Sequence, residues 1–204
     1  MIESLIDAFL KGGLVMLPIA VVSVVLWYLI IERIFFFRRQ SDLLDYELLY
    51  ALEDFVRGNE TALRSFSEKS SGVISHIIKK VLSVNRQDRP ELERVVKESV
   101  EVEMPCFEQH LEAIATLTGV APLLGLLGTV SGMILSFDVI TLSGTGDVHA
   151  LSRGVAQALI TTQLGLIVAL PGLLMHTRLE NRAQRMIQEL NKIKLRMLRF
   201  ARIK

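Results

Sequence analysis

The chain has 204 residues, half of them apolar, and a formal net charge of +1. It holds one cysteine, so an intrachain disulfide and a cysteine-based metal site are excluded. Its four histidines are scattered and form no His-x-x-x-His pair, so we expect neither a metal site nor a cofactor.

Three long runs of the sequence carry no charged side chain. They cover residues 12–31, 113–137 and 154–177, and about 20 residues are enough to cross the hydrocarbon core of a membrane as a helix. Buried helices of a soluble protein are a poor alternative in a chain of this size. We therefore predict an all-α integral membrane protein with transmembrane helices at 13–35, 113–137 and 154–175.

The distribution of positive charge predicts the orientation of these spans. Segment 1–12 has no basic start and no small-residue cleavage pattern, so it is not expected to be a cleaved signal peptide. Lys and Arg gather in the tail 176–204, whereas the loop 138–153 holds a single arginine. By the positive-inside rule, 1–12 and 138–153 lie outside, and 36–112 and 176–204 lie in the cytoplasm.

The cytoplasmic segment 36–112 is predicted to be helical. Amphipathic runs follow the expected N-caps Ser41 and Asn59, and a third covers residues 72–84. Pro90 then opens a run without a stop signal, which predicts one helix on the order of 70 Å from about residue 90 to the end of the second span. Kinks are expected at Pro105 and Pro122. Such long projecting helices bury little of their surface within a single chain, so they are expected to form the walls of an oligomer.

The charge of the cytoplasmic parts limits the choice of partners. Segment 36–112 has more acidic than basic residues, so we expect no nucleic acid. The basic tail 176–204 suits anionic lipid headgroups or acidic helices, but the positive-inside bias explains it equally well. Glu32 and Arg33 are expected to pair at the inner end of the first span.

The uncharged stretch "APLLGLLGTVSGMI", residues 121–134, is rich in small residues. In lipid, small side chains mark close helix contacts, and Gly128, Gly132 and Ser136 recur at small-xxx-small spacing. Two interpretations of the polar side chains within the spans are possible: they face a water path, or they only join helices by hydrogen bonds. The spacing of these residues does not decide between the two interpretations. The residues expected to pack the spans together are Pro122, Gly125, Gly128, Gly132, Ser136, Gly154, Ala158, Gly165 and Pro171.

Two stretches resemble the ExbB/TolQ/MotA family of proton-channel subunits. They are "APLLGLLGTVSGMILSF" and the later "GVAQALITTQLGLIVALPGLL", and the similarity is strong over residues 110–175. Subunits of the MotA type have four spans, so three predicted spans favour the ExbB/TolQ branch. The loop sequence "GTGD" and the segment "ITTQLGLIVALPGLL" are closest to ExbB.

The resemblance implies a subunit of a bacterial inner-membrane motor. Such proteins form a homopentamer around a pore that holds ExbD-like single-span partners, whose membrane aspartate carries the proton. Work from the proton motive force passes through a TonB-like protein to outer-membrane transport. The alternatives are a TolQ-like subunit that supports envelope integrity and a non-conducting membrane scaffold. An enzyme is not expected, because no nucleophile, base and orienting group occur together.

The resemblance also implies which residues line the proton pathway. They are Thr129 and Thr162, whose hydroxyls both donate and accept hydrogen bonds, with Thr161 and Gln157 nearby. Many family members have Glu where this chain has Gln157. Because Gln cannot ionise, the proton would be carried by the partner's aspartate, or Gln157 would only order water or pack at the pore mouth.

Overall fold

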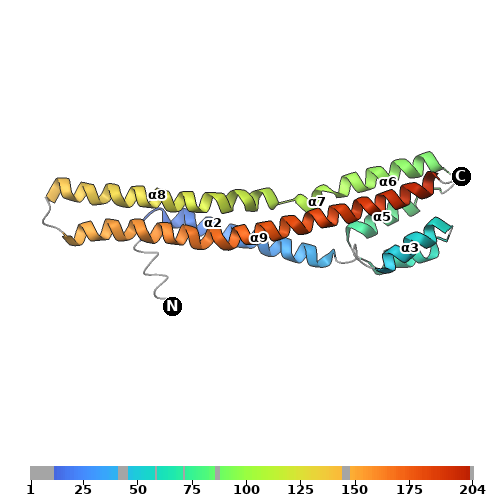
Figure 1. The fold of residues 1–204 in the computed structure, drawn as a ribbon, viewed down its shortest axis with the longest axis horizontal. Coiled ribbons are helices and arrows are strands. Elements are labelled where there is room, and N and C mark those ends of the chain that lie inside the picture. The colour runs from blue at the N-terminus through green and yellow to red at the C-terminus, as the bar shows by residue number, and fades with distance from the viewer. Residues whose placement is uncertain are drawn as a thin grey trace. The chain divides into compact units, whose positions relative to one another are not determined.

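A computed structural model describes residues 12–40, 46–57, 59–70, 72–85, 88–143 and 148–202. Within these ranges the regular structure is entirely helical, which confirms the predicted all-α fold (Figure 1). The helices are α2 (Met16–Arg39), α3 (Tyr46–Arg57), α4 (Thr61–Lys69), α5 (Val73–Leu82), α6 (Arg89–Glu103), α7 (Pro105–Glu108), α8 (Leu111–Ser143) and α9 (Val148–Arg202).

Three helical stretches are long and apolar enough to cross a membrane. They are Met16–Arg39, Arg89–Thr141 and Leu151–Arg199. The second and third contain the predicted spans 113–137 and 154–175, and the first overlaps the predicted span 13–35 from Met16 onward. The chain is therefore a multi-pass membrane protein. The positions of the membrane faces and the side on which each terminus lies stay predictions.

The chain forms two compact units. The first comprises Met1–Ile31 and His110–Thr177, and the second comprises Glu32–Gln109 and Arg178–Lys204. α2 and α9 each contribute one part to either unit.

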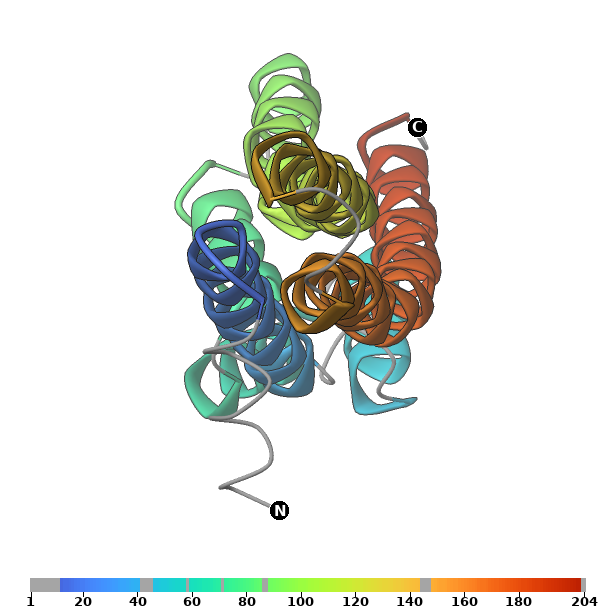
Figure 2. The ribbon, with the colours of Figure 1, turned by 90° about the vertical axis from the view of Figure 1, so that its left-hand side faces the viewer.

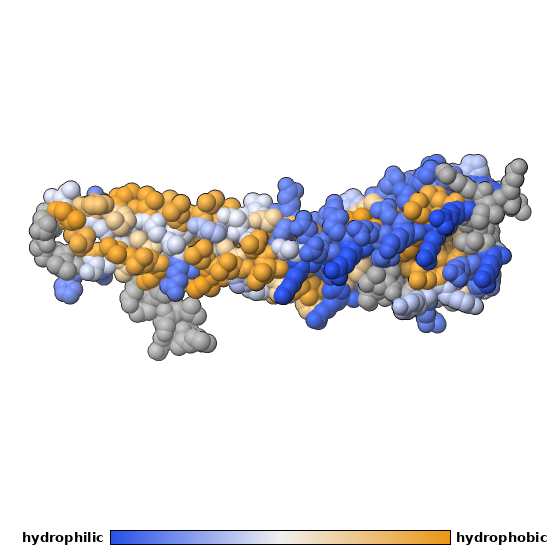
Figure 3. All heavy atoms as spheres, viewed as in Figure 1, coloured by the Kyte–Doolittle hydropathy of each residue, from blue (hydrophilic) through white to orange (hydrophobic). Residues whose placement is uncertain are grey.

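In the first unit, α8 and α9 lie side by side, with the first part of α2 against them (Figures 1 and 2). A Cβ placed on Gly172 of α9 would lie 2.9 Å from Leu26 Cδ2 of α2 and from Thr118 Oγ1 of α8, so all three helices meet there. The outer surface of this unit is largely apolar (Figure 3). Leu123 and Leu159 are each about two-thirds exposed, which suits lipid or a neighbouring subunit rather than water.

In the second unit, α3, α4, α5 and α6 pack in succession. α5 contributes a mostly apolar inner face that includes Ile74, Ile77 and Ile78. The buried Gln40, just after α2, accepts the backbone N–H of Val73 through Oε1 at 3.1 Å and so caps the start of α5. Charged side chains cover much of this unit's visible surface (Figure 3).

The described residues test two sequence-based expectations about helix ends. Asn59 Oδ1 accepts the backbone N–H of Thr61 at 3.1 Å, but the predicted N-cap is one residue off, because Glu60 occupies the N-cap of α4 and its side chain makes no capping bond. The run that contains Pro90 begins one residue earlier, and Asp88 caps it by accepting the N–H of Glu91 at 3.2 Å. The expected cap Ser41 lies outside the described residues.

The predicted unbroken helix from about residue 90 through the second span is wrong. α6 ends at Glu103, the short α7 follows, and α8 begins at Leu111. Pro105 has no N–H to continue the helical ladder, and His110 adopts a left-handed φ of 64°. α8 does continue through Pro122, because one missing bond inside a long helix is tolerated when neighbouring helices support it.

Candidate functional site

The central contact of the first unit joins α8 to α9 through facing glycines. A Cβ at Gly125 would lie 3.1 Å from the Thr162 Cα, and one at Gly165 would lie 3.1 Å from the Gly125 Cα. The two backbones are therefore so close that side chains would hold them apart. Because lipid provides no hydrophobic drive between helices, this close packing is what stabilises their association.

The contact continues from Gly125 towards the C-terminal end of α8. A Cβ on Gly128 would overlap the Thr161 side chain, and one on Gly132 would lie 2.9 Å from the Ala158 nitrogen. Ser136 Oγ donates to Gly132 O at 3.0 Å and lies against Gly154 of α9. All of these expected packing residues thus lie along one α8–α9 seam.

Two further expected packing residues differ in their surroundings. Pro171 is half-buried inside α9. Pro122 lines an apolar groove of about 460 Å³ between α8 and α9. The other residues that line this groove are Ala115, Thr118, Gly119, Leu166, Ala169, Leu170, Leu173 and His176.

Thr129 and Thr162 lie near one another at the edge of this seam. Thr162 Oγ1 donates to Gly125 O across the two helices at 3.1 Å, and Gly125 is one helical turn from Thr129. Thr129 Oγ1 donates to Leu126 O in its own helix at 2.6 Å. Each hydroxyl thus donates its proton to a carbonyl of the same chain. The lone pairs of both hydroxyl oxygens can still accept a hydrogen bond from another donor.

Thr161 and Gln157 occupy different surroundings. Thr161 is fully buried, and its Oγ1 donates to the carbonyls of Gln157 at 3.0 Å and Ala158 at 2.9 Å. The half-buried Gln157 side chain lies against Gly13, whose φ of 70° precedes the start of α2. Both residues therefore make packing contacts in this chain, and their place in the proton pathway stays a prediction.

The second unit contains a buried arginine whose full role the sequence did not indicate. Arg33 is 1% exposed and its Nε contacts Glu32 Oε2 at 3.1 Å, which confirms the predicted pair. Arg33 also donates through Nη1 to Cys106 O at 2.9 Å and through Nη2 to Gln109 Oε1 at 3.3 Å. Those partners are more than 70 positions away, so local spacing held no signal for them.

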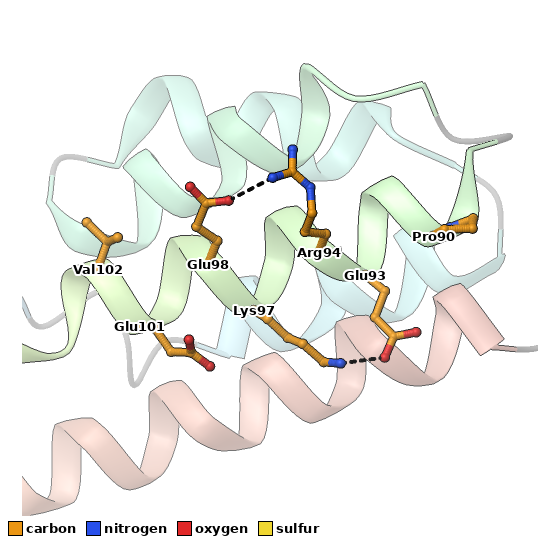
Figure 4. Close-up of a pocket in the computed structure, with 7 residues that line it drawn as sticks. All are labelled: Pro90, Glu93, Arg94, Lys97, Glu98, Glu101 and Val102. Carbon is orange, nitrogen blue, oxygen red and sulfur yellow. Dashed lines mark ion pairs between the residues drawn. The ribbon is translucent and has the colours of Figure 1, made fainter.

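A groove of about 610 Å³ runs along the outer face of α6, where charged side chains pair with one another (Figure 4). Lys97 Nζ contacts Glu93 Oε1 at 2.8 Å, and Arg94 Nη1 contacts Glu98 Oε2 at 3.5 Å. Arg94 also donates to both oxygens of Glu91, and this hydrogen bonding holds the pKa of the Glu91 carboxyl below its usual range. The pairs are a solvated helix face that stabilises α6.

Among the described residues, no three His, Cys, Asp or Glu side chains gather where they could hold a metal ion. The polar groups of the predicted proton pathway are the hydroxyls of Thr129, Thr161 and Thr162, the amide of Gln157 and nearby backbone carbonyls. Such groups can order water or bind a protonated carboxyl group, but they provide no titrating group near neutral pH.

Residues 69–192 match the model of the MotA/TolQ/ExbB proton channel family. This match covers more than half of the chain, and the chain belongs to that family. It is a proton-channel subunit of the kind associated with biopolymer transport.

Several named relatives favour the ExbB branch. The chain is 33% identical over 178 residues to the biopolymer transport protein ExbB-like 1 of Synechocystis, covering 83% of this chain and 68% of the relative. It is 30% identical to an ExbB homolog of Methanothermobacter thermautotrophicus, covering 82% of this chain but 60% of that protein. The Tol-Pal system protein TolQ of Haemophilus influenzae is 31% identical over 43% of this chain and 38% of its own length. These two ExbB-like relatives therefore match a larger share of the chain than this TolQ protein does.

Proposed function

We propose that the chain is the pore-forming subunit of an inner-membrane motor. In this proposal it assembles as a homopentamer around ExbD-like single-span partners and passes the energy of proton flow to a TonB-like protein. Membership of the proton-channel family and the extent of the match to ExbB-like relatives support this assignment. The N-terminus is proposed to lie in the periplasm and the C-terminus in the cytoplasm.

The observation that carries the proposal is the pair Thr129 and Thr162. They lie within about one helical turn of each other beside the α8–α9 seam, and both oxygens keep lone pairs that can accept a hydrogen bond. A partner's aspartate that carries a proton into the membrane needs such acceptors when neutral. When the aspartate is charged, it needs hydrogen-bond donors instead. Rotation of either threonine hydroxyl would direct an O–H towards the carboxylate.

The test replaces each hydroxyl by a methyl group of nearly the same size. We expect Thr129→Val and Thr162→Val, with the partner present, to lower proton flux into vesicles at least about tenfold, because an acceptor in the pathway is lost. Thr177→Val is the matched control, since Thr177 Oγ1 makes a similar bond to Leu173 O on α9 and is exposed. Normal flux through a correctly assembled Thr129→Val, Thr162→Val double variant would contradict the proposal.

A TolQ-like role is the second candidate, because TolQ proteins match part of the chain. The two roles differ in the proteins that accompany the subunit. Gentle purification of the tagged chain followed by mass spectrometry would separate them. An ExbD-like protein with a TonB-like protein supports the transport motor, whereas a Tol-system partner supports envelope maintenance. Isolation without any aspartate-bearing single-span partner would favour a non-conducting scaffold.

A further inference from the structure

The exposed side of α9 in the second unit carries a row of basic side chains that the proposed proton pathway does not use. This part of α9 begins at Arg178, and the helix continues to Arg202. Residues seven positions apart on an α-helix lie within about 20° of the same face and about 10 Å apart along the axis. Lys or Arg occupies every seventh position here and is exposed each time, at Arg178, Arg185, Lys192 and Arg199. This basic row is therefore about 30 Å long.

The packing of α9 fixes the direction in which the basic row points. The buried apolar residues of the same stretch recur at alternating steps of four and three: Leu179, Ala183, Met186, Leu190, Ile193 and Met197. This spacing keeps them on one face of the helix, in the core of the second unit. The basic row occupies another face, which the chain leaves exposed.

The rest of the chain does little to neutralise the basic row. Three residues follow members of the row at a spacing of four, namely Arg182, Glu189 and Arg196. Only Glu189 is acidic, and its Oε1 pairs with Lys192 Nζ at 2.7 Å. No ion pair with a described residue neutralises Arg178, Arg185, Arg196 or Arg199. This face of α9 thus presents an excess of positive charge.

Positive charges at this spacing destabilise the helix that carries them. Like charges three or four positions apart on a helix repel, and this arrangement occurs from Lys192 to Arg196 and from Arg196 to Arg199. On the outer face of α6, in contrast, charges of opposite sign pair with one another, as Arg94 does with Glu98. Carboxylates that bind between the cations of α9 would relieve the repulsion, so the row favours an acidic partner.

The positive-inside bias does not account for the whole row. That bias acts within about 15–20 residues of the end of a span. The predicted third span ends at residue 175, so Arg196 and Arg199 lie beyond this distance. The bias also requires no particular face of a helix, whereas the row keeps to one face of α9. A partner that binds along α9 accounts for both features.

An exposed leucine beside the basic row indicates the kind of partner. Leu195 is 60% exposed, and it lies three positions after Lys192 and four before Arg199, so the three share one side of the helix. Phosphate groups of a lipid headgroup or of a nucleic acid bind cations but offer a leucine no apolar contact. A protein helix with acidic and apolar side chains on one face covers Leu195 and binds the cations as well.

We propose that the exposed face of α9 between Arg178 and Arg199 binds an acidic amphipathic helix of a partner protein. Carboxylates of that helix pair with the basic row, and an apolar side chain contacts Leu195. This surface lies wholly in the second unit. It does not depend on the assignment of the proton pathway, so the failure of either proposal leaves the other standing.

Binding of a defined peptide tests the proposal. The probe is a fluorescent peptide of about 20 residues, long enough to follow the row, in which Glu and Leu alternate at helical spacing. The protein is the intact chain in phosphatidylcholine nanodiscs, and empty nanodiscs are the blank. We expect saturable binding in fluorescence anisotropy. The double variant Arg185→Gln, Arg199→Gln should bind at least about fivefold more weakly, because two charged contacts are lost.

The double variant Lys79→Gln, Lys80→Gln is the matched control for lost charge. Both lysines are exposed on α5 in the same unit, so this variant removes the same net charge away from the basic row. We expect it to change the affinity by less than about twofold, because the peptide does not contact α5. All four positions are exposed, so the variants should fold, and circular dichroism checks this.

A second peptide tests the apolar contact. It has Ser in place of every Leu, so it keeps the charge of the first peptide without its apolar face. We expect the wild type to bind the Glu/Leu peptide at least about tenfold more tightly than the Glu/Ser peptide, and Leu195→Asn to reduce this preference at least about threefold. Val102→Asn, at another exposed apolar position of the unit, is the matched control and should leave the preference unchanged.

Other results would overturn the proposal. The absence of saturable binding of the Glu/Leu peptide to the wild type would exclude the docking surface. An equal loss of affinity in the two double variants, or equal affinity of the wild type for both peptides, would show that net charge alone attracts them. Tighter binding of a soluble short-chain phosphatidylglycerol than of the Glu/Leu peptide would assign the basic row to lipid headgroups instead.

Discussion

At the residue scale, contacts with residues far away in the sequence determine the role of a side chain. The pairing of Glu32 and Arg33 followed from their adjacency, and the structure confirms it. The bond from Arg33 to the Cys106 carbonyl did not follow, because its acceptor lies 73 residues further along the chain. Thr161 and Thr162 are neighbours, yet one is fully buried against Gly128 and the other reaches the Gly125 carbonyl.

The single cysteine provides a test of these surroundings. Burial, reinforced by the nearby Glu103 carboxylate, raises the pKa of the Cys106 thiol to about 11, although Arg33 opposes the shift. We therefore expect alkylation of Cys106 in the folded protein to stay slow at pH 8 and to rise towards pH 11. The rate of iodoacetamide labelling at each pH measures the reactivity of the Cys106 thiol, and circular dichroism at the same pH shows whether the protein is still folded.

The same shift has a defined effect on stability. Between the ordinary thiol pKa, near 9, and about 11, the unfolded chain has lost the proton while the folded chain retains it, so the contribution of Cys106 to stability falls as pH rises. Removing the carboxylate with Glu103→Gln should move the labelling profile to lower pH. An unchanged profile in that variant would show that Glu103 has no influence on the thiol.

At the scale of the elements, small residues determine how closely α8 and α9 approach. The small-xxx-small spacing in the sequence predicted that α8 packs closely against another helix, but it did not say which one. The structure shows that the partner is α9. The start of α6 could be predicted to within one residue, because Pro90 acts on the first turn of its own helix. The end of α6 could not be predicted, because Pro105 is compatible with either a kink or a break and tertiary contacts decide between them.

Two glycines of α8 allow a matched test of this seam. An added Cβ at Gly128 overlaps the Thr161 side chain, so Gly128→Ala should force the helices apart and destabilise the protein by about 1–3 kcal/mol. A Cβ at Gly119 meets nothing within 4 Å, so Gly119→Ala should be neutral or stabilise α8 by about 0.5–1 kcal/mol. Thermal unfolding in detergent measures both variants. Equal effects of the two substitutions would show that the seam does not limit helix approach.

At the scale of the whole molecule, the family assignment and the three apolar helical stretches agree on a multi-pass proton-channel subunit. The large exposed apolar surface of the first unit is what a single chain presents when its natural surroundings are lipid and other subunits. The assembly itself stays a proposal, as do the ExbD-like and TonB-like partners.

Site-directed labelling tests the predicted orientation. In a Cys106→Ser background, we expect His149→Cys, in the segment 138–153, to react with a membrane-impermeant maleimide added to spheroplasts. Tyr46→Cys, in the segment 36–112, should react only after the membrane is opened. Both positions are exposed in the structure, so access depends on the side of the membrane. Labelling of Tyr46→Cys alone in intact spheroplasts would reverse the assignment.

The sequence by itself determined the class of protein, the helical fold and the three apolar stretches, because uncharged runs and the family motif are properties of consecutive residues. The side-chain surroundings required the tertiary structure. Only the fold brings Thr162 to Gly125, encloses Thr161 and carries Arg33 to the Cys106 carbonyl. Helix period and composition act over a few residues, whereas a contact such as that of Arg33 with the Cys106 carbonyl depends on which elements the folded chain places together.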